Sequence, residues 1–245
     1  GLIIYRLLGI TEKIYNIICI KKNLLSKLYL RALNLKNKII ISTNDGSWAE
    51  KLKENLNDKD FFLMFNGTNL IKEKSTPKIK ETLNITCMSR LEPEKGYLEL
   101  LDILNLLKKK SIKFKVTIIG DGTSKQEIIN KVHQLNLIQS VELKGILEHS
   151  QIEKCLEKTD LFISYNYLGM FGNNVIEASS KGIPIVALDN EILNSEYKKF
   201  FYVIKKSSSE DTVNFIEKFN YELNLRKKYS ELSTMFFERY VVNWN

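Results

Sequence analysis

The chain has 245 residues, 44% of them hydrophobic, which is enough to bury a substantial core. A charged fraction of 27% and only three prolines argue against a disordered chain and favour an ordered α/β protein. The apolar runs, such as 2–4 and 61–65, are strand-sized, and none approaches the roughly 20 residues of a membrane-spanning helix.

The formal net charge of +8 lies entirely in the first third of the chain. Residues 1–80 contain 15 Lys and Arg against 7 Asp and Glu, whereas residues 81–245 contain 22 of each. A basic surface there suits an anionic membrane, a nucleic acid or a phosphorylated acceptor. Solvated lysines in a chain rich in Lys, Asn and Ile explain the charge equally well, so both interpretations stay open.

The first block of the chain, residues 1–66, has the pattern of the end of an α/β domain. Its predicted elements are strand 2–6, helix 21–36, strand 38–42, helix 47–56 and strand 61–65. Three strands are too few for a Rossmann-like domain of usual size. We therefore expect the C-terminal remnant of one, in a chain whose N-terminal part lies upstream of Gly1. Turn residues at 66–69 begin a linker that we place at 67–82.

In the second block, short apolar strands alternate with amphipathic helices. The predicted strands are 83–88, 114–119, 141–144, 161–165, 183–188 and 201–204, and the predicted helices are 96–110, 124–136, 150–158 and 174–181. This alternation predicts a doubly wound parallel sheet over residues 83–225. Two polar helices are expected at 208–225 and 226–239, and the last segment, 226–245, is expected to cross back to the first block.

Doubly wound sheets bind phosphates where strands end and helices begin, which directs attention to three loops. The first, 89–96, carries Arg90 and Lys95, and both cations could reach one diphosphate. A plain solvated turn is the alternative interpretation. The second loop contains Gly120 and Gly122, which let the backbone turn sharply and approach a ligand closely. Turns with two glycines are also common in α/β proteins without such a role.

The third loop opens a helix at Gly172 and Asn173, and it leaves two interpretations of Glu177. Asn174 and Glu177 have the three-residue offset of a capping box, so spacing alone favours a carboxylate that closes the helix start. The functional interpretation has Glu177 pointing from the first turn at a ligand ribose.

The cysteines and histidines form no recognisable catalytic or metal-binding group. Cys19, Cys87 and Cys155 are far apart, have no metal-like or redox-like spacing and suit a reducing compartment, so we expect a cytoplasmic protein. We also expect no metal and no cofactor. His133 and His149 belong to no Ser/His/Asp grouping and are assigned no role.

Taken in order, these loops resemble the C-terminal domain of the family 4, or group 1, retaining glycosyltransferases, which have the GT-B fold. That family has a Gly/Ser-Arg-Leu…Lys-Gly loop, a Gly-x-Gly turn, a Glu-x7-Glu segment and a buried Gly-x-Pro strand. The resemblance covers about residues 61–188. The matching segments are 66–67, 89–91, 95–96, 120–122, 141–145, 177–178 and 182–186.

The resemblance implies a nucleotide-diphosphate sugar as the donor and transfer, with retention, to a polysaccharide, a lipid-linked glycan or a similar acceptor. Arg90 and Lys95 would neutralise the donor diphosphate, and Glu177 would hold the ribose hydroxyls. Stabilising the departing diphosphate is electrostatic catalysis that requires no metal. The other residues expected at the donor are Gly120, Gly122, Gly145, Gly169, Gly172, Asn173 and Asn174. Peripheral contact with the inner face of an anionic membrane is expected through the first block, and nucleic-acid binding is not.

One residue departs from the family pattern. The first Glu of the Glu-x7-Glu segment should stand at position 169, where this chain has Gly169. A non-catalytic nucleotide-sugar-binding protein is therefore an alternative, as is another GT-B enzyme such as a sugar-nucleotide epimerase. We also expect residues 1–245 alone to be inactive, because most of an acceptor half is missing.

Overall fold

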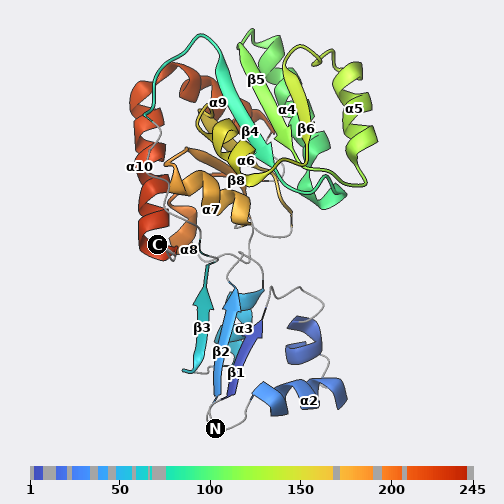
Figure 1. Cartoon of the computed structure of the whole chain (residues 1–245), viewed down its shortest axis with the longest axis vertical. Coiled ribbons are helices and arrows are strands. Elements are labelled where there is room, and N and C mark those ends of the chain that lie inside the picture. The colour runs from blue at the N-terminus through green and yellow to red at the C-terminus, as the bar shows by residue number, and fades with distance from the viewer. Residues whose placement is uncertain are drawn as a thin grey trace.

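The chain forms two blocks, each built on a parallel sheet (Figure 1). The computed structural model describes residues 3–7, 15–20, 24–33, 38–43, 48–56, 59–65, 67, 76–167, 172–189, 195–205 and 209–241. Among the helices of these segments, none combines the length and the apolar character needed to cross a membrane.

The first block is a three-stranded sheet in the order β1-β2-β3, with all strands parallel. Its elements are β1 (Ile3–Leu7), the π-helical turn η1 (Asn16–Ile20), α2 (Leu24–Leu33), β2 (Lys38–Thr43), α3 (Ala49–Leu56) and β3 (Phe61–Met64). The three predicted strands and both predicted helices are confirmed, whereas the π-helical turn was not predicted. A small core of Leu33, Ile40, Leu52 and Phe61 holds the block together.

The second block is a six-stranded parallel sheet in the order β6-β5-β4-β7-β8-β9, which confirms the doubly wound prediction. Its strands are β4 (Leu83–Met88), β5 (Phe114–Ile119), β6 (Val141–Gly145), β7 (Leu161–Ser164), β8 (Ile185–Leu188) and β9 (Tyr202–Ile204). The 3-10 turn η2 (Pro93–Lys95) is followed by α4 (Tyr97–Lys109), α5 (Lys125–Gln134), α6 (His149–Leu156), α7 (Asn173–Ser180), α8 (Ser195–Lys198), α9 (Ser209–Tyr221) and α10 (Leu223–Tyr240). The sequence did not predict η2 and α8, which are each a single turn.

Side chains of the central strands alternate between two apolar clusters, one on each face of the sheet. Leu161 and Ile163 belong to the cluster beneath α4, α5 and α9, which we call the first core cluster. Phe162 and Ile185 belong to the cluster beneath α6, α7, α8 and α10, the second core cluster. A strand that is buried on both faces has hydrophobic residues at successive positions. For this reason β7 and β8 could be recognised in the sequence as apolar runs.

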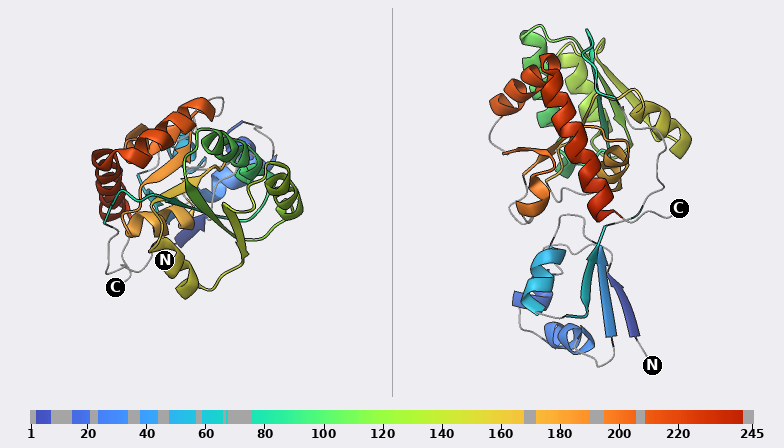
Figure 2. Two further views of the ribbon diagram at one scale, coloured as in Figure 1. Left: turned by 90° about the horizontal axis from the view of Figure 1, so that it is seen from above. Right: turned by 90° about the vertical axis from the view of Figure 1, so that its left-hand side faces the viewer.

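The two blocks meet at Phe65, the residue after β3. Its ring lies 5.3 Å from the rings of Tyr197 and Phe236 and 6.1 Å from that of Tyr240, measured between centroids. These partners lie on α8 and α10, so the first block inserts one aromatic side chain into the second core cluster. Figure 2 shows α10 running along the second block to this junction.

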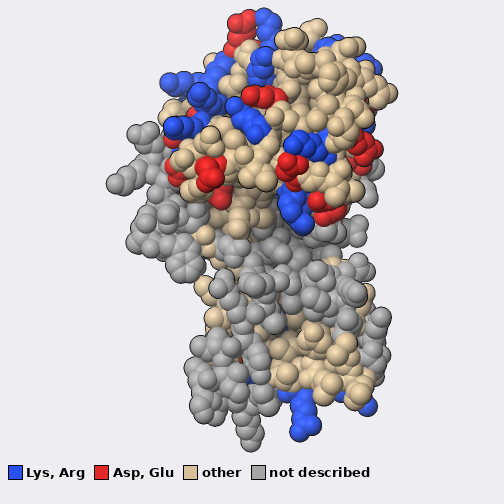
Figure 3. Space-filling model, turned by 45° about the vertical axis from the view of Figure 1, so that its right-hand side comes forward, with Lys and Arg blue, Asp and Glu red and all other residues tan. Residues whose placement is uncertain are grey.

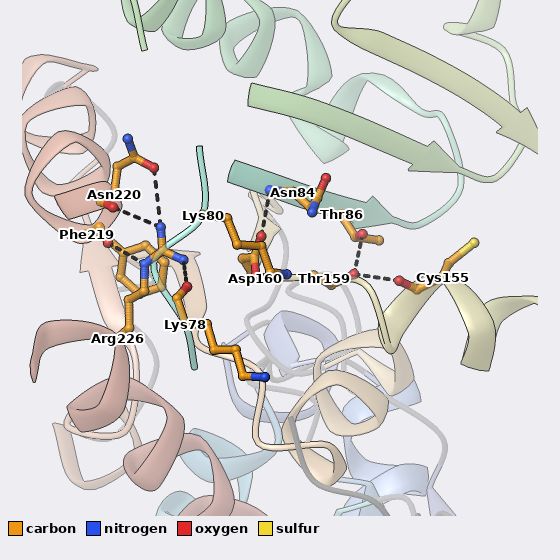
Figure 4. Close-up of polar contacts among 10 residues, drawn as sticks. All are labelled: Lys78, Lys80, Asn84, Thr86, Cys155, Thr159, Asp160, Phe219, Asn220 and Arg226. Atoms are coloured by element: carbon orange, nitrogen blue, oxygen red, sulfur yellow. Dashed lines mark hydrogen bonds and ion pairs between the residues drawn. The ribbon is translucent and has the colours of Figure 1, made fainter. Parts of the chain in front are cut away.

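A second connection between distant segments is made by Arg226 of α10, whose side chain is fully buried. Its guanidinium donates to the carbonyl oxygens of Lys78 at 2.6 Å, Phe219 at 2.8 Å and Asn220 at 3.0 Å (Figure 4). Lys78 lies on the segment that enters β4, and the other two end α9. Arg226 therefore fastens the chain between the blocks to the C-terminal helices.

Replacing Arg226 by Met should lower the free energy of unfolding by about 3 kcal/mol, because three buried carbonyls lose their donors at roughly 1–3 kcal/mol each while the buried charge is relieved. Urea unfolding followed by circular dichroism measures this loss. Arg239→Met is the matched control, since Arg239 is exposed and pairs with Glu196 at 3.3 Å on the surface, and it should cost about 0–1 kcal/mol. Equal losses for the two variants would contradict the role of Arg226.

Candidate functional site

A cavity of about 450 Å³ opens at the carboxyl ends of β4 and β7. These strands are neighbours in the sheet, and the chain leaves them toward opposite edges, β4 to β5 and β7 to β8. Such a switch in winding direction separates the two following loops and leaves a crevice between them, where doubly wound sheets bind ligands.

The cavity brings together residues from the first and third loops singled out in the sequence. Arg90 and Lys95 reach it from the loop after β4, and Glu177 reaches it from α7. The remaining predicted residues that line it are Gly172, Asn173 and Asn174. Two cations, one carboxylate and a helix start from segments some 80 residues apart thus share one space.

The Arg90 loop is held by backbone hydrogen bonds to the turn between β5 and α5. The Leu91 N–H donates to the Asp121 carbonyl at 2.9 Å, and the Ser124 N–H donates to the Leu91 carbonyl at 2.8 Å. The contact is so close that a Cβ atom at Gly122 would lie 2.5 Å from the Leu91 oxygen, and one at Gly120 would collide with the Ser89 oxygen. Gly120 and Gly122 therefore support the cavity from behind and are not among its lining residues.

Lys95 is positioned by the tight turn η2 and by Gly96, which has the left-handed φ of 59°. A Cβ atom on Gly96 would lie 2.5 Å from the ring of Tyr165, so only glycine lets the two loops approach this closely. The Tyr167 N–H also donates to the Glu94 carbonyl at 2.9 Å. The loop after β7 is thereby fixed against the loop that carries Lys95.

The start of α7 faces the cavity and is tied to β4. Gly172 is the N-cap residue, and the Asn174 amide donates to the Met88 carbonyl while its oxygen accepts from the Val175 N–H at 2.9 Å. The capping-box interpretation of Glu177 is therefore wrong. The helix begins two residues earlier than that interpretation requires, so Asn174 is its second residue and Glu177 its fifth, beyond the first turn.

Glu177 lies in an environment that disfavours its charge. Its side chain is largely buried, and the Oε2 atom is buried without a hydrogen-bond partner among the described residues. This burial raises the pKa of the carboxyl group; the nearby charge of His149 lowers it and that of Glu153 raises it. A buried acceptor that faces a cavity is suited to a ligand with hydroxyl donors.

Other expected residues lie elsewhere. Gly145 ends β6 with a φ of 67°, and its carbonyl accepts from the Gly120 N–H at 2.8 Å. It does not line the cavity. Gly169 lies outside the described residues, as does Asn66. Within the described segments, no group of three or more His, Cys, Asp or Glu could hold a metal ion.

Several cavity residues were missed by sequence reasoning. Tyr97 closes one wall with its hydroxyl 2.8 Å from the Ser89 Oγ, and burial raises the pKa of this phenol. Cys87 lies beside it, and burial raises the pKa of its thiol to about 12. Ser89, Tyr165 and Asn166 directly follow strands, and that position was the available signal for them.

Residues 69–234 match the model of the family described as glycosyl transferases group 1. The chain belongs to this family. It is 30% identical over 189 residues to the poly(ribitol-phosphate) alpha-N-acetylglucosaminyltransferase of Staphylococcus aureus, covering 76% of this chain and 37% of that protein. It is 24% identical over 103 residues to the 2-deoxystreptamine N-acetyl-D-glucosaminyltransferase of Niallia circulans, covering 42% and 26%. The chain thus spans well under half the length of these curated relatives.

Solved structures give the same family fold. The structure of TarM aligns with a TM-score of 0.66 at 22% identity, covering 84% of this chain and 48% of that one. The Anabaena protein HepE, solved in complex with UDP-glucose, aligns with a TM-score of 0.70 at 17% identity, covering 98% and 68%. The architecture of this group 1 chain is therefore the GT-B type, as the sequence predicted.

Replacing Glu177 by Gln should raise the thermal stability of this group 1 chain at pH 7. An acid whose folded-state pKa is raised destabilises the fold at pH values above its unfolded pKa, because only the unfolded state ionises freely. This gain in stability should vanish near pH 4, where the carboxyl group of Glu177 is largely protonated in both the folded and the unfolded state. Melting temperatures of the two proteins at pH 4 and pH 7 test this, and a variant less stable at both would show that the carboxylate is a structural anchor.

Proposed function

We propose that the protein is a glycosyltransferase that moves a sugar from a nucleoside-diphosphate sugar to an acceptor with retention of configuration. The observation that carries the proposal is the single cavity at the β4/β7 crevice, which holds Arg90, Lys95 and the partly buried Glu177 together. Its volume of about 450 Å³ lies within the usual range of small-molecule sites.

The cations suit the diphosphate of such a donor. When the sugar–phosphate bond breaks, negative charge develops on the departing diphosphate, and preformed positive groups stabilise that charge most where water is excluded. Arg90 can donate two parallel hydrogen bonds to phosphate oxygens, and Lys95 adds a point charge. The positive end of the α7 dipole lies in the same cavity and favours the same anion.

The carboxylate of Glu177 suits the ribose. Ribose hydroxyls are donors, and Oε2 is a buried acceptor for which the described residues offer no donor. Binding would therefore satisfy an atom that is costly to leave unpaired. Front-face attack by the acceptor, with the diphosphate as the leaving group, follows the resemblance and gives retention without a metal or a cofactor.

For the acceptor, we propose a polysaccharide, a lipid-linked glycan or a polyol-phosphate polymer. The S. aureus relative is named for transfer to poly(ribitol-phosphate), and the Niallia circulans relative for transfer to 2-deoxystreptamine. The excess positive charge of the first block supports contact with an anionic membrane. So does α2, where Leu24 and Leu28 are 75% and 56% exposed beside Lys27.

A second candidate is a nucleotide-sugar-binding protein without turnover. It is favoured by Gly169, which stands where the family has a carboxylate for the transferred sugar. Nucleotide binding is common to both candidates, so only sugar transfer by a full-length protein separates them.

Replacing Arg90 or Lys95 by Ala should weaken UDP binding by roughly 10- to 150-fold, because each charge-assisted hydrogen bond contributes about 1.5–3 kcal/mol. Uridine binding should change little, since uridine has no phosphate. Isothermal titration calorimetry with both ligands measures this difference. Lys125→Ala is the control: Lys125 lies on the same edge of the sheet, is paired with Asp121 at 2.9 Å and does not line the cavity. Equal losses for UDP and uridine would refute the diphosphate role.

Residues 1–245 alone should bind the donor nucleotide but transfer no sugar. Holding donor and acceptor in register supplies roughly 7–11 kcal/mol of barrier reduction, and the chain spans only 37% of its S. aureus relative. Transfer from radiolabelled donor sugar to a cell-wall or membrane extract is the measurement, compared with a longer version of the protein. Robust transfer by residues 1–245 would show that the acceptor site lies within them.

A further inference from the structure

The peptide group that follows Arg90 is held at both of its polar ends. Its carbonyl oxygen accepts a hydrogen bond from the Ser89 Oγ at 3.0 Å, and its N–H, which belongs to Leu91, donates to the Asp121 carbonyl at 2.9 Å. Because a peptide group is planar, bonds at its two opposite ends fix its orientation. Arg90 is exposed, so core packing does not hold its side chain. The backbone therefore sets the direction of the Arg90 Cα–Cβ bond at the sheet edge.

Ser89 is in turn held by Tyr97, the first residue of α4. The two hydroxyl oxygens lie 2.8 Å apart. Ser89 has one hydroxyl proton, and this proton is donated to the Arg90 carbonyl, an oxygen that can only accept. Tyr97 is therefore the donor in the pair. The hydrogen bonds run in one direction, from the Tyr97 hydroxyl to the Ser89 Oγ and from there to the Arg90 carbonyl.

Tyr97 is a rigid support for this chain of hydrogen bonds. Its side chain is buried in the first core cluster, where side chains are closely packed. Burial raises the pKa of the phenol, so the hydroxyl keeps its proton and remains a donor at neutral pH. A phenylalanine would fill the same space in the cluster. What the hydroxyl adds is the contact with Ser89, beside the residue that carries the guanidinium.

Charge elsewhere on the second block does not replace this local arrangement. Residues 81–245 contain equal numbers of basic and acidic residues, and on the face shown in Figure 3 the described Lys and Arg side chains of this block are interspersed with Asp and Glu. Exposed charges are screened within about 8 Å at physiological salt. Attraction of a diphosphate therefore depends on the cations that line the cavity and on where their side chains point.

We propose that Tyr97 is a positioning residue for Arg90: through Ser89, it holds the peptide group that directs the guanidinium toward the donor diphosphate. This role rests on the proposed function, because it concerns a ligand with a diphosphate. Tyr97 and Ser89 also line the cavity, so a direct contact between the Tyr97 hydroxyl and the ligand is the competing explanation. The two explanations differ in what happens when the Arg90 side chain is removed.

Replacing Tyr97 by Phe should weaken UDP binding roughly 2- to 10-fold, the loss expected for one hydrogen bond, and leave uridine binding unchanged. In the Arg90→Ala background, the same replacement should cost no further UDP affinity, because no guanidinium remains to be positioned. Calorimetry on the single variants, the double variant and the unchanged protein measures this coupling. A loss that adds in full to that of Arg90→Ala, or an equal loss of uridine affinity, would overturn the proposal.

Tyr202→Phe is the matched control. Tyr202 also packs against the first core cluster, and its hydroxyl donates to the Asp211 carbonyl at 3.4 Å. It lies on β9 at the edge of the sheet and does not line the cavity. Its replacement should change neither UDP nor uridine affinity. If Tyr202→Phe weakened UDP binding as much as Tyr97→Phe, the effect would be a general one and the role of Tyr97 would be refuted.

Hydrogen exchange of backbone amides, measured by NMR, tests the same role without a ligand. In Tyr97→Phe and in Ser89→Ala, the Leu91 N–H should exchange roughly 2- to 10-fold faster, because its peptide group has lost a restraint. The Val116 N–H in β5, which donates to the Ser140 carbonyl at 2.7 Å, should change less. Equal acceleration at both amides would indicate a general loss of stability and would contradict the positioning role.

The proposed function and the role of Tyr97 fail on different results. Equal losses of UDP and uridine affinity in Arg90→Ala would refute the diphosphate role, and the exchange of Leu91 would still decide whether Tyr97 holds the Arg90 loop. A loss in Arg90→Ala that is specific to UDP, together with unchanged UDP binding in Tyr97→Phe, would leave the proposed function standing and overturn the role of Tyr97.

Discussion

The backbone contact between the loop after β4 and the turn after β5 sets the position of the catalytic candidates. Two N–H···O bonds join Leu91 to the 121–124 turn, and they form only because residues 120 and 122 have no Cβ atom. This contact fixes the backbone beside Arg90 at the edge of the sheet, and the turn η2, which carries Lys95, follows directly. The glycines thus contribute to the site through geometry. In the sequence they looked like ligand contacts because a close approach of backbone to backbone and one of backbone to ligand require the same residue.

Glu177 lies at a position that lowers the stability of the fold. Its carboxylate is held where burial raises its pKa, and one oxygen has no partner among the described residues. A residue selected for stability alone would not keep an ionisable group there. The neighbouring Asn174 has the opposite character, since both ends of its amide are engaged and it secures α7 to β4. The start of α7 therefore carries Asn174, which anchors the helix to β4, and Glu177, whose Oε2 atom can accept a hydrogen bond from a ligand.

The sequence predicted the sheet well because its signal was local. Strands such as β7 and β8 are apolar on both faces, and the intervening helices show a clear period, so every long element was found. The single turns η2 and α8 were missed because segments of three or four residues are too short to show a helical periodicity of hydrophobic residues. The site was predicted where residues sit at strand ends, as for Arg90 and Lys95. Tyr97 and Cys87 were missed because a helix-start tyrosine and a strand cysteine look like core, and only packing shows that they also face a cavity.

The helix α6 lies between two hollows of the second block. Ile152 lines the cavity at the β4/β7 crevice, while Gln151 and Lys154 line a second hollow of about 670 Å³ over β4, β5 and β6. Neighbouring positions of one eight-residue helix therefore face opposite sides. This division follows from the sheet beneath it. At β7 the second face is apolar, with Phe162 in the second core cluster, whereas the same face of β5 and β6 carries Lys115, Glu142 and Lys144. The alternation of side chains along β5 and β6 thus leaves one side of α6 over apolar residues and the other side over charged ones.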